Sequence, residues 1–96
     1  MSYKKVVIET YHHTGGGSAK KIRARPVKGQ NFDTSMNVEC SSKMRKSYPV
    51  GTKFLIDARV SSKEGGTNFL YSHQESPYEI VTDEQAQEFI ANIYGR

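Results

Sequence analysis

One stretch of the sequence alternates in polarity over more positions than any other. From Phe54 to Val60 every second residue is apolar, and three of the four residues at 53, 55, 57 and 59 are charged. A period of two indicates a β-strand with one buried face and one exposed face. We therefore predict a strand over residues 52–61, against which other strands pair. Asp57, on its exposed face, is expected to form an ion pair with Lys53 or Arg59.

A tight turn is predicted immediately before this strand. Pro49 and Gly51 are the second and fourth residues of the tetrapeptide that starts at Tyr48. Proline fixes φ near the value that the second position of a type I turn requires, and glycine is favoured at the fourth position. The two residues therefore predict a type I turn.

Five further segments have the composition of short strands. They are rich in β-branched or aromatic residues or alternate in polarity, and segments rich in glycine, serine or proline separate them. Their expected ranges are 3–11, 18–27, 35–40, 68–73 and 78–81. Pro26 has no amide N–H, so the second strand is expected to lie at an edge of the sheet or to end there. Glycines at 15–17 and 65–66 predict hairpin connections. Residues 41–47 are expected to form a loop or one helical turn.

The C-terminal segment follows a helical period instead. Thr82 and Gln85 have the spacing of a capping box, and acidic residues in the first turn favour the helix dipole. The apolar stripe of this segment consists of Ala86, Phe89, Ile90 and Ile93. We therefore predict a helix over residues 83–94 that packs on an open end or a face of the sheet.

These elements define an α+β fold. A chain of 96 residues forms one domain, here residues 1–96, with a single core. The expected architecture is a strongly curved antiparallel β-sheet or a small, partly open β-barrel of five or six strands, with the C-terminal α-helix packed on it.

The expected compartment is the cytoplasm. No apolar run approaches the length of a membrane span, and the N-terminal residues show no signal-peptide pattern. Cys40 is the single cysteine, which excludes an intrachain disulfide and fits a reducing environment.

Neither catalysis nor metal binding has a specific pattern in the sequence. His12 and His13 are adjacent, so on an extended chain they point to opposite faces and do not chelate one ion together. The segment Gly15–Ser18 lacks the spacing of a phosphate-binding loop. We therefore expect a binding protein and not an enzyme, with no cofactor and no metal.

Positive charge is concentrated in the N-terminal half. Residues 1–46 contain ten Lys or Arg and three acidic residues, whereas residues 47–96 contain four and seven. Cations at every second position of a strand, with tyrosines nearby, are typical of surfaces that hold single-stranded nucleic acid. The predicted nucleic-acid contacts are Lys21, Arg23, Arg25, Lys43, Arg45, Lys46 and Tyr48. The cations are expected to bind phosphates, and the tyrosine is expected to stack on a base.

Other interpretations of these residues remain open. Alternating Lys and Arg also protect an edge strand from edge-to-edge aggregation, and Tyr48 can simply pack on the barrel. The alternative function is that of a protein–protein interaction or homodimerising adaptor module without nucleic-acid binding, in which the edge strand at 18–25 pairs with a partner or a second copy. Salt separates the two functions, because it weakens phosphate contacts far more than strand pairing.

Overall fold

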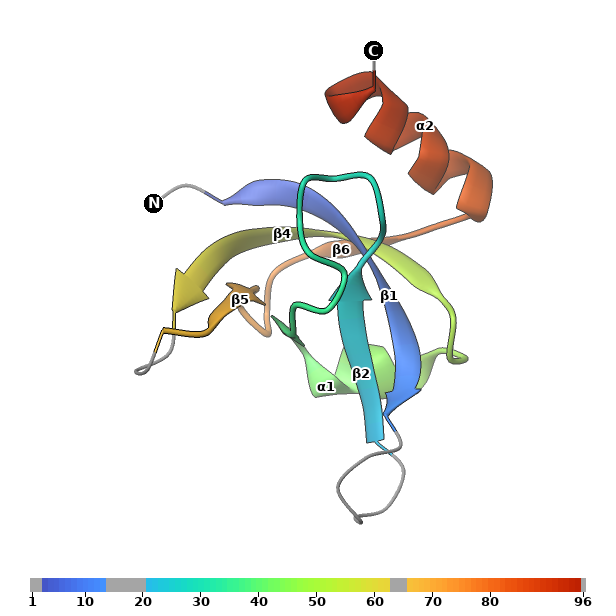
Figure 1. Cartoon of the computed structure of the whole chain (residues 1–96). Coiled ribbons are helices and arrows are strands. Elements are labelled where there is room, and N and C mark those ends of the chain that lie inside the picture. Colours follow the sequence, from blue (N-terminus) through green and yellow to red (C-terminus); the bar gives the residue numbers. More distant parts are fainter. Residues whose placement is uncertain (1–2, 14–20, 63–65, 96) are drawn as a thin grey trace.

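A computed structural model describes residues 3–13, 21–62 and 66–95, without the side chains of His13 and Lys21. Within these ranges the chain forms six strands and two helices (Figure 1). Their bounds are β1 (Lys4–His13), β2 (Lys21–Pro26), β3 (Val38–Glu39), α1 (Ser42–Ser47), β4 (Lys53–Ser62), β5 (Asn68–Tyr71), β6 (Tyr78–Val81) and α2 (Asp83–Tyr94). Neither helix in this part of the chain is both long enough and apolar enough to cross a membrane.

The strands form one sheet that curves into an almost closed barrel. Its order is β2-β1-β4-β5-β3, and β6 pairs with residues 53–56 of β4, on the same side as β5. All neighbours are antiparallel except β3 and β5, which are parallel. The curvature brings β3 close to β2, but no backbone pairing joins these two strands in the described ranges (Figure 1). We call this opening the seam. The predicted α+β fold, a curved sheet or partly open barrel with a C-terminal helix, is confirmed.

The alternation predicted for β4 produces the barrel core. Phe54, Ile56 and Ala58 are buried there, together with Val6 and Ile8 of β1. Val60 continues the same series but is exposed, because β1 pairs with β4 only as far as Ala58. The ion pair of Asp57 also differs from the prediction. Its partner is not a neighbour on the same strand but a residue of β1, Lys5, which lies directly opposite it at 3.1 Å.

A second apolar cluster lies outside the barrel, under α2. Ala86 and Ile90 of the helix are buried against Val7 of β1, and Leu55 of β4 packs beside them. The helix therefore covers part of the outer face of the sheet rather than an open end of the barrel. Its predicted bounds and capping box are confirmed. Ile93 is 59% exposed, so the buried stripe is shorter than predicted.

The short helix α1 contributes to the barrel core instead. The segment was expected to be a loop or a helical turn, and it forms a helix whose Met44 side chain is buried in the core. The hydroxyl of Ser41 accepts a hydrogen bond from the Met44 N–H at 3.1 Å and caps the helix start. Because α1 contacts β2, its polar residues lie near the seam.

The turn before β4 is shifted by one residue from the prediction. The Thr52 N–H donates to the Pro49 carbonyl at 3.2 Å, so Pro49 is the first residue of the turn and Gly51 the third. Gly51 has a φ of +97°. A positive φ at the third position is the mark of a type II turn, which explains the glycine better than the predicted type I turn.

Several strand boundaries also differ from the predicted ones. β1 continues beyond residue 11 to His13, because His12 and His13 pair with the start of β2. The strand expected over 35–40 is only Val38–Glu39, because Asp33 accepts hydrogen bonds from the N–H and hydroxyl of Ser35 and turns the chain there. Residues 18–20 and the predicted hairpin glycines at 15–17 and 65 lie outside the described ranges.

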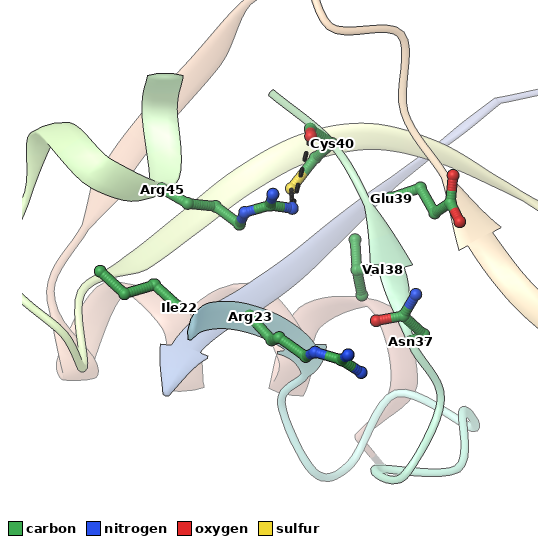
Figure 2. A pocket seen from close by; sticks show the side chains of 7 residues that line it. All are labelled: Ile22, Arg23, Asn37, Val38, Glu39, Cys40 and Arg45. Atoms are coloured by element: carbon green, nitrogen blue, oxygen red, sulfur yellow. Dashed lines mark hydrogen bonds between the residues drawn. The ribbon is translucent and has the colours of Figure 1, made fainter. Parts of the chain in front are cut away.

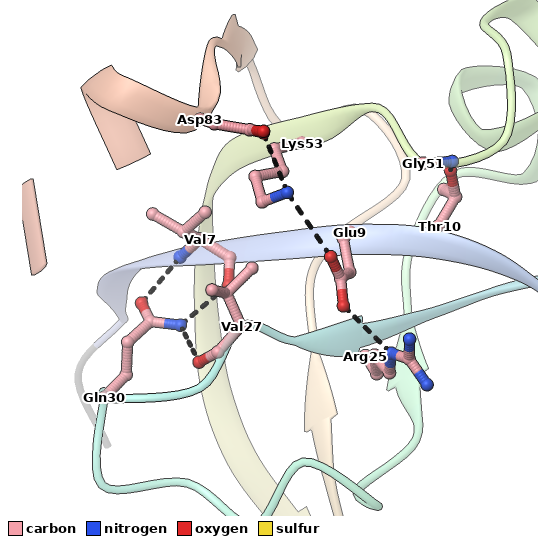
Figure 3. A network of polar contacts seen from close by, with 9 residues as sticks. All are labelled: Val7, Glu9, Thr10, Arg25, Val27, Gln30, Gly51, Lys53 and Asp83. Atoms are coloured by element: carbon pink, nitrogen blue, oxygen red, sulfur yellow. Dashed lines mark hydrogen bonds and ion pairs between the residues drawn. The ribbon is translucent and has the colours of Figure 1, made fainter. Parts of the chain in front are cut away.

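One buried polar side chain connects β1 to the segment after β2. Gln30 has no exposed surface, and its Oε1 accepts a hydrogen bond from the Val7 N–H at 2.8 Å. Its Nε2 donates to the carbonyl oxygens of Val7 and Val27 at 2.8 and 2.9 Å (Figure 3). Gln30 thus takes the place of a neighbouring strand where the pairing of β1 with β2 ends.

We expect Gln30→Ala to lower the free energy of unfolding by about 2–3 kcal/mol, because it leaves the buried Val7 N–H without a partner. Urea denaturation measures the change. Gln87→Ala on the exposed face of α2 is the matched control, with an expected change within about 0.5 kcal/mol. Equal effects of the two substitutions would contradict the bridging role of Gln30.

Candidate functional site

A cavity of about 370 Å³ opens at the seam. Its walls come from β2, from β3 with its flanking residues, and from α1 (Figure 2). The lining residues are Ile22, Arg23, Asn37, Val38, Glu39, Cys40 and Arg45. Four of these seven side chains carry a charged or amide group, so the cavity favours a polar or charged ligand.

Arg45 enters this cavity from α1 with its guanidinium only partly satisfied. Its Nη1 lies 3.5 Å from the carbonyl oxygen of Cys40 and 3.9 Å from the Sγ of the same residue. Its Nε is buried and has no hydrogen-bond partner in the part of the chain that the structure describes. A buried N–H without a partner is unfavourable, and no carboxylate within 4 Å neutralises this guanidinium in the described ranges.

Arg23 reaches the same cavity from β2. Its guanidinium has no ion pair or side-chain hydrogen bond within residues 3–13, 21–62 and 66–95. Glu39 also lines the cavity, but it already has an interaction of its own. Figure 2 shows the side chains of Arg45 and Glu39 on opposite sides of β3. The cavity therefore contains two arginines and one glutamate, and neither arginine has an ion pair among the described residues.

Arg25, the next cation along β2, is already paired. Its Nε donates to the Glu9 carboxylate at 3.0 Å, and its guanidinium lies 4.6 Å from the centre of the Tyr11 ring. Lys53 continues this network, 3.5 Å from Glu9 and 2.9 Å from Asp83 (Figure 3). The hydrogen bond to Asp83 raises the pKa of the Lys53 ammonium. The network fixes α2 to β4 and balances the charge of Arg25.

The remaining predicted contacts differ in their surroundings. Lys43 and Lys46 are exposed on α1, the helix that also supplies Arg45 to the cavity. The side chain of Lys21 lies outside the described residues. Tyr48 is half-buried against the barrel core, with its ring centre 5.6 Å from that of Phe54. The structure thus brings the α1 cations near β2 and places Tyr48 in the barrel wall.

A second polar surface, which the sequence analysis missed, lies on the outer face of the sheet. The guanidinium of Arg59 lies 5.7 Å from the centre of the Tyr3 ring and 5.2 Å from that of Tyr71. We call these three residues the aromatic row. The register explains it, since Arg59 pairs directly with Tyr71 on β5 and Tyr3 precedes the residue of β1 that pairs with Ala58. The alternation along each segment places the three side chains on the outer face of the sheet. The sequence alone does not show that they are neighbours, because this depends on the strand register.

Comparisons add no assignment to these surfaces. No protein-family model, curated protein or solved structure matches the chain. Among the described residues, no three His, Cys, Asp or Glu side chains gather so that they could hold a metal ion. Because a fold alone does not define a function, the function has to be inferred from the site.

The burial of Cys40 in the cavity wall can be tested through the pH dependence of stability. Burial raises the pKa of the Cys40 thiol, and the positive charge of Arg45 only partly opposes this rise. The folded state therefore favours the neutral thiol. Its contribution to stability is complete below the pKa of an unfolded cysteine, about 8.5, and is lost as the pH rises through the higher folded value. We expect urea denaturation between neutral and alkaline pH to show this loss in the wild type but not in Cys40→Ala. Parallel pH profiles of the two proteins would contradict it.

Proposed function

We propose that the protein binds single-stranded nucleic acid and that the seam cavity holds a backbone phosphate. The observation that carries this proposal is the pair of arginines, Arg23 and Arg45, that line one open cavity with no ion-pair partner in the described ranges. Guanidinium groups match phosphate oxygens in geometry and charge, and they form stronger hydrogen bonds with them than with neutral acceptors.

The surroundings of the cavity support the same ligand. Lys43 and Lys46 extend the positive charge along α1, and Lys21 begins the strand that carries Arg23. Arg25 and Tyr48 belong to the proposed surface at its margin, where one is paired and the other is packed on the core. A cationic groove on a curved β-surface is a common arrangement for single-strand binding.

The proposed role is binding and not catalysis, and the proposed compartment is the cytoplasm. Cys40, the single cysteine, agrees with a reducing compartment. Burial raises the pKa of its thiol, which favours the neutral form over the more nucleophilic thiolate and agrees with a binding role.

Fluorescence anisotropy with labelled oligothymidylate tests the phosphate site. We expect Arg23→Glu to weaken binding by about tenfold or more, since a charged hydrogen bond is replaced by repulsion. The slope of the logarithm of the affinity against the logarithm of the salt concentration should become shallower by about 0.7 for each phosphate that the variant no longer binds.

Lys28→Glu is the matched control, because it makes the same change of charge at an exposed residue that does not line the cavity. It should have a much smaller effect on binding. Equally weakened binding in the two variants, or no binding by the wild type, would refute the site.

A second candidate function is self-association through β6. This strand pairs only with β4 among the described strands, and two of its side chains, Tyr78 and Ile80, are 41% and 46% exposed. Exposed apolar residues on a strand with one unpaired edge favour pairing with a second copy around a two-fold axis. The apolar side chains thus lie on β6 and not on β2, the edge strand that the sequence predicted for pairing.

We expect light scattering across a range of concentrations to show a dimer that Ile80→Glu dissociates, because the substitution introduces a charge into the apolar contact. Val60→Glu, at another exposed apolar residue on β4, is the matched control and should leave the mass unchanged. A wild-type protein that is monomeric throughout would remove this candidate.

A further inference from the structure

The aromatic row of Tyr3, Arg59 and Tyr71 contributes to neither apolar cluster in the described part of the chain. Tyr3 is 45% exposed, and Arg59 and Tyr71 are partly exposed. The helix α2 covers the outer face around Val7 and Leu55 and leaves this end of the face open. The row is therefore a surface feature whose planar groups are accessible to a ligand.

The charge of the row is not neutralised within the structure. Arg59 lies between the two rings, and its Nε donates to the Tyr3 hydroxyl at 3.4 Å, but no carboxylate pairs with it in residues 3–13, 21–62 and 66–95. The nearest acidic residue along its strand, Asp57, is occupied by Lys5 at 3.1 Å. The guanidinium contacts both tyrosine side chains, and its positive charge remains available to an anionic ligand.

The row is also connected to the seam through the strand register. Glu39, which lines the cavity, pairs with Tyr71 across β3 and β5, and Tyr71 pairs with Arg59 across β5 and β4. Neighbouring strands are about 4.8 Å apart, so Tyr71 begins one strand spacing from the cavity wall. A ligand that occupies the cavity therefore reaches the row if it passes across β3 at Glu39.

We propose that the aromatic row is a stacking platform for the bases of a single strand whose phosphate lies in the seam cavity. This inference rests on the proposed function and adds the part of the ligand that contacts this face. Tyrosine rings and the guanidinium plane offer flat surfaces that stack on any base, while Arg59 attracts the backbone. Aromatic side chains on the exposed face of a sheet hold bases in the same way in RNA-recognition domains.

The unpaired arginine favours a nucleic acid over a protein partner on this surface. An apolar protein surface would have to desolvate the charge of Arg59 without returning an ion pair, which is unfavourable. A nucleic acid supplies both a phosphate for the cation and planar bases for the rings.

The test compares oligothymidylate with an abasic oligonucleotide of the same length, which has the phosphates but no bases. We expect the wild type to bind oligothymidylate about tenfold more tightly, since stacking on the row strengthens binding by about that factor per base. Tyr71→Leu removes the ring and should abolish most of this preference, whereas Tyr71→Phe keeps the ring and should preserve it. Arg23→Glu should weaken binding of both oligonucleotides alike.

Tyr3→Leu provides a second variant of the row in case Tyr71→Leu lowers stability, because Tyr3 precedes β1 and belongs to neither cluster. It should also reduce the preference for oligothymidylate over the abasic oligonucleotide.

Equal wild-type affinity for the two oligonucleotides, or a preference that both leucine variants retain, would overturn the platform and leave the phosphate site intact. Binding to neither oligonucleotide would overturn both proposals. A dimer that Tyr71→Leu dissociates, without nucleic-acid binding, would assign the row to self-association instead.

Discussion

β4 pairs with three strands, and the shape of the molecule follows from this arrangement. One side of β4 is occupied by β1, while the other side pairs with β6 over residues 53–56 and with β5 over residues 59–62. Two strands share one side of β4, and the sheet curves as it passes from one to the other. β5 in turn positions β3, which forms one wall of the seam. The same register places Arg59 between Tyr3 and Tyr71. Both candidate surfaces thus depend on the pairing of this single strand.

The seam exists because β2 and β3 are held by other partners. Gln30 hydrogen-bonds the segment after β2 to Val7 of β1, and Asp33 turns the chain before β3 begins. Only two residues of β3 remain extended, and they pair with β5. α1 follows β3 and brings Arg45 into the opening, where backbone hydrogen bonds would otherwise close the barrel. A polar cavity results where the sheet is discontinuous.

The sequence predicted the main periodic elements and missed contacts that depend on register, although the local turn before β4 was also assigned to the wrong type. The period of two in β4 and the capping box of α2 are local patterns, and both predictions held. The partner of Asp57 was wrong because it lies across the sheet on β1, at a separation that no local spacing reveals. Gln30 was missed for the same reason, since its partner Val7 is distant in sequence. Arg23 was in the predicted contact set from alternation alone, whereas the neighbours of Arg59 required the strand order.

The division of β1 between the two apolar clusters has a consequence for how the protein unfolds. Val6 and Ile8 belong to the barrel core, and Val7 between them belongs to the cluster under α2. Three consecutive residues thus contribute to both clusters, so α2 cannot separate from the sheet without exposing a residue whose neighbours anchor the barrel. We therefore expect opening at the helix to weaken β1 as well, and so to be coupled to unfolding of the barrel.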